Sequence, residues 1–166
     1  QFAYSMLTRS QRISHENLRL RDAQYVADFE QWFGERACAQ AGVEAPPGAK
    51  MLPMLTPLRV RSVLLKNRIV VSPMAQYSAV DGVPGDYHLV HLGARALGGA
   101  AMVFAEMTCV SADARITPAC PGMYTPEHTA AWKRIVDFVH ASTDAKIAMQ
   151  LGHAGAKGST RVMWDG

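Results

Sequence analysis

From residue 57 onward, short apolar runs alternate with longer amphipathic segments, and this alternation restricts the chain to few folds. The expected strands cover residues 69–71, 100–105 and 146–151. Buried strands that alternate with helices are typical of parallel α/β folds. Three such strands in about 85 residues match the strand spacing of a (β/α)₈ barrel, which needs about 250 residues to close. The sequence therefore predicts an α/β fold, a partial (β/α)₈ TIM barrel made of its first three βα units.

Capping signals bound the two helices expected between these runs. Asp86 is the expected N-cap of a helix from about Tyr87 to Leu97, and Gly98-Gly99 can end it in a left-handed conformation. Thr125 and Pro126 supply an N-cap and a first-turn proline for the second helix. Its inward stripe is expected to consist of Trp132, Ile135, Val136 and Val139.

The first part of the chain has a different organisation. Residues 14–36 predict a helix with one apolar face, formed by Leu18, Tyr25, Phe29, Trp32 and Phe33. Its solvated side would carry Arg19, Asp22, Asp28, Glu30 and Glu35. Residues 39–54 are rich in Pro and Gly, which favours an extended connector. We expect residues 1–38 to be the helical tail of a preceding domain, 39–54 a linker, and 55–166 the N-terminal part of the barrel, beginning with a short hairpin near 58–65.

Composition argues against several classes of protein. The formal net charge of +3 comes without any basic run of five, so no nucleic-acid surface is expected. The longest apolar run, 100–105, is far too short to cross a membrane, which favours a soluble cytoplasmic protein.

The three cysteines show no C-x-x-C spacing, so reduced thiols are expected. His88 and His91 have no third ligand at a suitable spacing, so we expect packing roles and no metal. Gln1 at the start and an apolar pair near the end suggest that both ends are cut.

In a βα barrel the chemistry sits at the carboxyl ends of the strands. The informative segments are therefore 72–77, 106–108 and 150–157. Taken together, they resemble the old yellow enzyme family of NADH:flavin oxidoreductases and NADPH dehydrogenases. The resemblance covers residues 51–166 in order: 66–74 resemble the family's opening signature, 86–88 with 95–99 its first helix, 104–108 its second strand, 115–118 the loop that follows, and 150–155 its third strand end.

This resemblance implies an FMN cofactor, NAD(P)H as reductant and a small-molecule acceptor such as an activated alkene. Gln150 would hold the pyrimidine edge of the flavin, because a side-chain amide can both donate and accept hydrogen bonds. The other implied cofactor-binding residues are Ser72, Pro73, Met74, Ala75 and Met107. Tyr77 is the implied catalytic residue, lining the substrate side, and Glu106 is expected to hold loops by hydrogen bonds. One branch of the family has Cys where Ala75 stands, and many members have Arg at Ala156.

The first fifty residues add a finer hypothesis. Residues 2–10 and the helix after them resemble the connecting segment of bifunctional salicylyl-CoA 5-hydroxylases and 2-aminobenzoyl-CoA monooxygenase/reductases. That likeness implies an upstream FAD domain and an aryl-CoA substrate. At full length we expect a homo-oligomer. Three alternatives stay open: a stand-alone ene reductase, a non-flavin barrel lyase or isomerase that uses Glu106 or Lys157, and a non-catalytic chain whose helix binds a partner. In the family the proton donor and the FMN phosphate site come from later strands, so residues 1–166 alone are expected to be inactive.

Overall fold

The computed structural model describes residues 22–158, 160–162 and 164. The chain divides into two compact units, residues 1–64 and 65–166. The first contains α3 (Ala23–Ala41), β1 (Leu58–Val60) and most of β2 (Val63–Leu65). The second contains β3 (Val70–Val71), α4 (Asp86–Leu97), β4 (Met102–Cys109), α5 (Pro126–Ser142) and β5 (Lys146–Gly152). Short 3₁₀ turns lie at Pro53–Leu55, Ala112–Ala114 and Gly155–Lys157.

Helix α3 lies further along the chain than predicted. Its N-cap is Asp22, whose carboxylate accepts a hydrogen bond from the Tyr25 backbone N–H at 2.9 Å. It ends at Gly42, which has a φ of 68° in the left-handed region open to glycine. Residues 39–41 of the predicted linker are therefore helical, while residues 14–21 lie outside the described residues. Strands β1 and β2 pair with each other, which confirms the predicted hairpin.

The predicted apolar face of α3 is wrong. Trp32 is 53% exposed, whereas Glu30, expected on the solvated side, is 1% exposed. The buried residues are Val26, Glu30, Gly34, Ala37, Cys38 and Ala41. Small residues let the helix approach its neighbours closely, since a Cβ placed on Gly34 would lie 3.3 Å from the Met51 Cβ. The aromatic residues pack against one another, with 5.9 Å between the ring centroids of Phe29 and Trp32.

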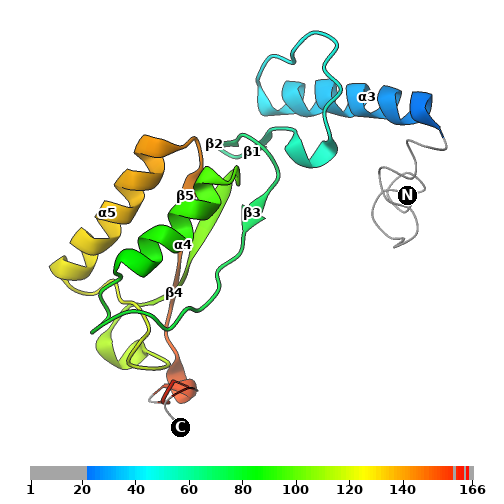
Figure 1. Cartoon of the computed structure of the whole chain (residues 1–166). Helices are drawn as coiled ribbons and strands as arrows, with labels where there is room; N and C mark the ends of the chain where they lie inside the picture. The colour runs from blue at the N-terminus through cyan, green and yellow to red at the C-terminus, as the bar shows by residue number, and fades with distance from the viewer. Residues whose placement is uncertain (1–21, 159, 163, 165–166) are drawn as a thin grey trace. The chain divides into compact units, whose positions relative to one another are not determined.

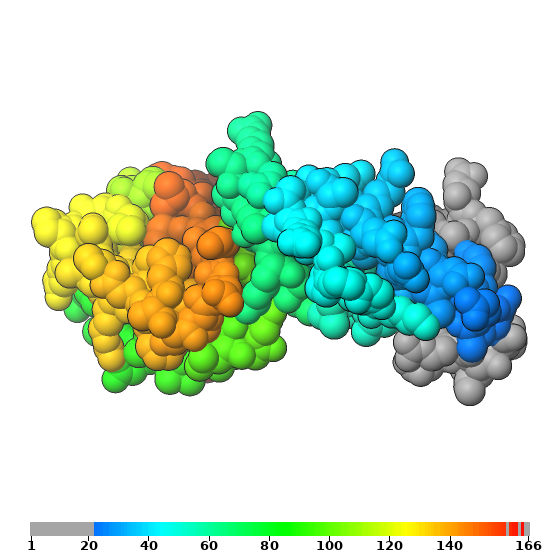
Figure 2. Space-filling model, turned by 90° about the horizontal axis from the view of Figure 1, so that it is seen from above, coloured from blue at the N-terminus to red at the C-terminus, as the bar shows by residue number. Residues whose placement is uncertain are grey.

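The second unit is a parallel sheet with helices on one face, as predicted (Figure 1). The strand order is β3-β4-β5, and both neighbouring pairs are parallel. Helices α4 and α5 pack together against one face of the sheet. Their shared core consists of Leu92 and Ala96 from α4, Ala100, Val103 and Ala105 from around β4, Trp132, Ile135 and Val139 from α5, and Ala145. The apolar stripe of α5 is thereby confirmed, except that Val136 is only half-buried. At the surface of the unit, α5 runs from yellow to orange in Figure 2.

The helix ends follow the capping signals with one correction. Gly85, not Asp86, is the N-cap of α4, and Asp86 is the first helical residue. The Asp86 carboxylate instead lies 2.6 Å from Nη1 of Arg134 on α5, in an exposed ion pair, while the His88 ring accepts a hydrogen bond from the Gly85 backbone N–H. Helix α4 ends as predicted: Gly99 has a φ of 102°, and the Ala100 N–H donates to the Arg95 carbonyl at 3.4 Å. The Thr125 cap of α5 is also confirmed, since its hydroxyl accepts from the His128 N–H at 3.2 Å.

Strand β4 is longer than predicted. It continues to Cys109, so residues 106–108 belong to the strand and not to the loop after it. After β5, residues 155–157 form a short 3₁₀ turn, and the described residues that follow β5 contain no α-helix. The third βα unit is therefore present as a strand and the start of its loop. No helix in the described part of the chain has the length and apolar character needed to cross a membrane.

Candidate functional site

The carboxyl ends of β4 and β5 bring two of the predicted site residues together. Met107 and Gln150 are register partners across the two strands. On β5, Ile147 and Met149 pack toward the helices, so Gln150 points to the opposite face because side chains alternate along a strand. We call this opposite side, the one α4 and α5 do not cover, the helix-free face. Met107 and Gln150 thus lie side by side on the helix-free face.

A β-bulge produces this arrangement. Ala105 pairs with Met149 and Met107 with Gln150, so Glu106 is an extra residue with no partner on β5. Ala105 and Glu106 are consecutive, yet both are buried, at 1% and 4% exposure. A bulge re-aims the side chains that follow it. Glu106 is thereby turned toward α4, and Met107 returns to the helix-free face.

Unpaired hydrogen-bonding groups gather at this end of the sheet. The amide of Gln150 is exposed, and no described residue forms a hydrogen bond with it. Among the described residues, none accepts from the backbone N–H groups of Met74 and Ala75, which follow β3. The Met74 side chain is 43% exposed. One free amide, two free N–H donors and a polarizable apolar surface fit a flat heterocycle that carries carbonyl and N–H groups at its edge.

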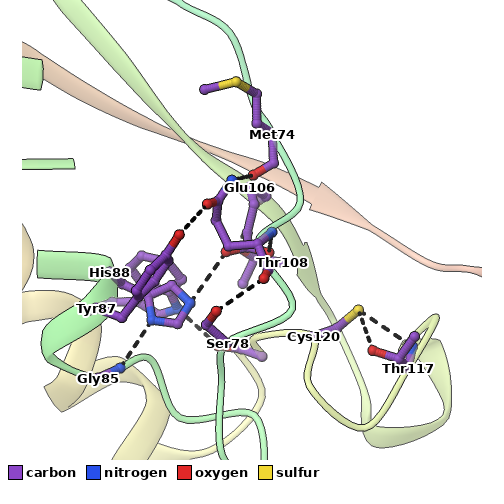
Figure 3. A network of polar contacts seen from close by, with 12 residues as sticks. Met74, Ser78, Gly85, Tyr87, His88, Glu106, Thr108, Thr117 and Cys120 are labelled. Atoms are coloured by element: carbon purple, nitrogen blue, oxygen red, sulfur yellow. Dashed lines mark hydrogen bonds and ion pairs between the residues drawn. The ribbon is translucent and has the colours of Figure 1, made fainter. Parts of the chain in front are cut away.

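The segment that carries Ser72, Pro73, Met74 and Ala75 is fixed at its far end, at Gln76. The Gln76 backbone N–H donates to Glu106 Oε2 at 2.7 Å (Figure 3). The Gln76 side-chain amide donates to the Met74 carbonyl and accepts from the Tyr87 hydroxyl, each at 2.7 Å. The prediction that Glu106 holds a loop by hydrogen bonding is confirmed. The participation of Gln76 and Tyr87 was missed, because an isolated Gln in a loop carries no periodic signal.

The two histidines of α4 have packing roles, as predicted. His88 is 2% exposed, and its Nε2 lies 3.3 Å from Glu106 Oε1. His91 is half-buried and stacks on the Tyr87 ring, with centroids 6.0 Å apart. Burial and the neighbouring Arg95 cation lower the pKa of His91. The described residues contain no cluster of three or more His, Cys, Asp or Glu side chains able to hold a metal ion.

Tyr77 lies beside the site in an unusual conformation. Its φ of 49° is rare for an aromatic residue, and such strain persists where the surroundings hold it. The ring packs with Met107 against the buried cluster of Cys109, Ala114 and Cys120. Its other contact is an edge-to-face pair with Trp164, at 6.2 Å between centroids. The substrate-side role of Tyr77 stays a prediction.

Met107 packs closely against two uncharged residues, Gly152 and Cys109. A Cβ on Gly152 would lie 2.7 Å from the Met107 Cγ, so the methionine lies directly over this glycine. The Met107 sulfur is 3.9 Å from Cys109 Sγ. Burial, with Cys120 nearby, raises the pKa of the Cys109 thiol to about 11. The Cys109 thiol therefore lines this side of the site as a neutral group.

A parallel sheet covered by helices on one face, with the predicted site residues at the carboxyl ends of its strands, is the arrangement expected of part of a (β/α)₈ barrel. Residues 53–162 match the NADH:flavin oxidoreductase / NADH oxidase family. The chain belongs to this family.

Individual relatives agree with that assignment. The chain is 41% identical over 106 residues to an NADPH dehydrogenase of Bacillus cytotoxicus, covering 63% of this chain and 30% of that protein. It is 37% identical over 124 residues to an NADH:flavin oxidoreductase of Gibberella zeae, covering 75% and 29%. Among solved structures, morphinone reductase in complex with tetrahydroNAD is similar with a TM-score of 0.58 and 35% identity, covering 62% of this chain and 28% of that one. The chain thus spans about 30% of the length of the curated relatives it matches.

Proposed function

We propose that this chain forms part of an FMN-dependent oxidoreductase that uses NAD(P)H, and that Gln150, Met107 and residues 72–75 bind the flavin. One observation carries the proposal: the Gln150 amide, unpaired among the described residues, lies beside Met107 at the carboxyl end of the sheet. The names of the relatives, NADPH dehydrogenase and NADH:flavin oxidoreductase, support the same activity.

Each residue has a physical task in this proposal. A bound flavin supplies the hydride transfer between nicotinamide and acceptor. The Gln150 amide donates to and accepts from the pyrimidine edge, and the N–H groups of Met74 and Ala75 donate to the ring. The thioethers of Met74 and Met107 provide polarizable contact. Tyr77 lies on the substrate side, where its hydroxyl can donate to an acceptor carbonyl.

The test is FMN binding by the full polypeptide that carries this sequence. We expect the purified protein to be yellow, or to quench the fluorescence of added FMN on binding. Gln150→Leu should weaken FMN binding at least about tenfold, because the flavin's polar edge would lose a partner that both donates and accepts hydrogen bonds. Gln40→Leu is the matched control: Gln40 is exposed on α3, outside the family match. A colourless protein that refuses FMN would reject the proposal.

The geometry disfavours a non-flavin lyase or isomerase built on Glu106. That carboxylate is buried, bonds Gln76 and faces His88, so it is not presented to the helix-free face. Lys157 is exposed in the turn after β5 and makes no described ion pair. No described contact therefore activates either side chain for proton abstraction.

We also propose a bifunctional aryl-CoA hydroxylase/reductase as the setting of this activity, with FAD in an upstream domain. The bifunctional setting rests on the likeness of residues 2–10 and of the helix after them. Residues 1–21 lie outside the described part of the chain. A stand-alone ene reductase fits the barrel segment equally well. FAD together with FMN in the protein, and oxygen-dependent turnover of salicylyl-CoA or 2-aminobenzoyl-CoA, would support the bifunctional setting. FMN alone, with reduction of a simple enone, would support the ene reductase.

A further inference from the structure

A connected set of polar groups joins helix α4 to the segment that follows β3. We call Gln76, Tyr87, His88 and Glu106 the Glu106 network (Figure 3). His88 and Glu106 are nearly inaccessible to solvent, while Tyr87 is 52% exposed. Buried polar groups of this kind are costly unless they are satisfied, so each member should be matched to its partner.

The backbone of the cap fixes which nitrogen of His88 carries the proton. Nδ1 accepts a hydrogen bond from the Gly85 N–H at 3.2 Å. In the neutral ring the proton is therefore on Nε2, the atom that faces Glu106 Oε1. This contact is electrostatic, because Nε2 makes no aligned hydrogen bond.

Only a carboxylate presents an acceptor oxygen to both neighbours of Glu106. Oε1 faces the Nε2–H of His88, and Oε2 accepts from the Gln76 N–H, so position 106 must present two acceptors. An amide would present one acceptor and one donor. The donor would face another N–H group in either orientation.

All these contacts converge on Gln76, two residues after Met74. Glu106 fixes its backbone, Tyr87 fixes its side chain, and that side chain fixes the Met74 carbonyl. No described hydrogen bond holds the N–H groups of Met74 and Ala75 themselves. Their position therefore depends on Gln76.

We propose that Glu106, His88 and Tyr87 are positioning residues that act through Gln76 to hold the Met74 and Ala75 N–H groups where the flavin binds. This inference rests on the proposed FMN function. It assigns the buried carboxylate to organising the cofactor site and not to proton transfer.

The test uses the full polypeptide and measures the FMN dissociation constant, the visible flavin absorption bands, and amide hydrogen exchange of residues 72–79 without FMN. Glu106→Gln should weaken FMN binding about tenfold, shift the flavin bands and speed exchange in that segment, because one of its two contacts must be lost. In the double variant Glu106→Gln, His88→Gln, an amide oxygen at position 88 can accept from the new amide. The double variant should therefore bind FMN more tightly than Glu106→Gln alone.

Two more variants keep the test decisive if Glu106→Gln does not fold. Tyr87→Phe and Gln76→Leu remove exposed hydrogen bonds and leave the buried pair intact, and each should weaken FMN binding about threefold or more. Asp86→Asn is the control, since it breaks an exposed ion pair on the same helix outside the network. If the wild type binds FMN and Glu106→Gln shows unchanged FMN affinity and flavin bands, this inference is overturned while the proposed function stands. The same conclusion follows if both Tyr87→Phe and Gln76→Leu leave FMN affinity and flavin bands unchanged. Failure of the wild type to bind FMN would reject the proposed function.

Discussion

Met107 and Gly152 show how one missing methyl group shapes the site. The methionine occupies the space that a Cβ at position 152 would need, at 2.7 Å from its Cγ and 2.8 Å from its sulfur. We expect Gly152→Ala to displace Met107 and weaken FMN binding by about 1 kcal/mol, the cost of forcing a packed side chain off its position.

A double-mutant cycle checks that explanation by FMN titration. In a Met107→Ala background the clash is gone, so Gly152→Ala should have almost no further effect. Equal effects in both backgrounds would show that the alanine acts through the backbone of β5 and not through Met107.

Cys109 gives a pH-dependent prediction. Its pKa is raised from 9.0 to about 11, mainly because burial disfavours the thiolate. The unfolded thiol ionises first, so the contribution of this group to stability is complete below pH 9 and is lost as the pH rises toward 11. Iodoacetamide should therefore label Cys109 slowly in the folded protein at pH 8.5 and rapidly in urea.

Peptide mass spectrometry after timed alkylation measures this rate. Cys38 and Cys120 are also buried, so the folded protein should show no fast-reacting thiol among the three. Rapid labelling of Cys109 at pH 8.5 without denaturant would contradict the raised pKa.

At the level of elements, α5 is bounded by signals that act locally. The Thr125 hydroxyl satisfies the His128 N–H at the helix start. Thr125→Ala should lower the free energy of unfolding by about 1 kcal/mol, whereas Thr125→Ser should keep the cap. Urea unfolding of the full polypeptide compares the two, and equal midpoints would show that the cap contributes nothing.

Such local signals explain which elements could be predicted. The caps at Thr125 and Gly99, the apolar stripe of α5 and the order of strands and helices all depend on neighbouring residues, so they could be predicted from the sequence. The parallel sheet followed from the alternation itself. These features set the carboxyl ends of the strands, and with them the region of the site.

The features that were missed depend on distant partners. Asp86 was predicted to cap α4, but it is the first helical residue, and its carboxylate pairs with Arg134 on α5, far along the chain. The buried face of α3 follows close packing around Gly34, which large aromatic residues obscure in a periodicity pattern. The bulge at Glu106 was invisible, because an acidic residue after an apolar run looks like the end of a strand. Within the site, the register pairing of Met107 and Gln150 therefore became visible only in the structure.

At the scale of the whole molecule, the three-stranded sheet limits what residues 1–166 can bind and catalyse by themselves. Among the described strands, β3 and β5 each pair only with β4, so each has an unpaired edge. The resemblance places the FMN phosphate site on later strands. Residues 1–166 expressed alone should therefore oxidise no NAD(P)H above a protein-free blank, followed by nicotinamide absorbance with added FMN. Measurable turnover would contradict this.

The bulge in β4 makes the number of residues in this strand as important as their identity. Up to Ala105 the side chains follow one odd-even order, and beyond it they follow the opposite order. Without the bulge the strand would keep the first order beyond Ala105, so a carboxylate would stand on the helix-free face and a thioether would face His88. Deleting Glu106 would remove the bulge and the carboxylate together and leave Met107 on its present face. The extra residue thus decides which of two neighbouring side chains borders the proposed flavin site.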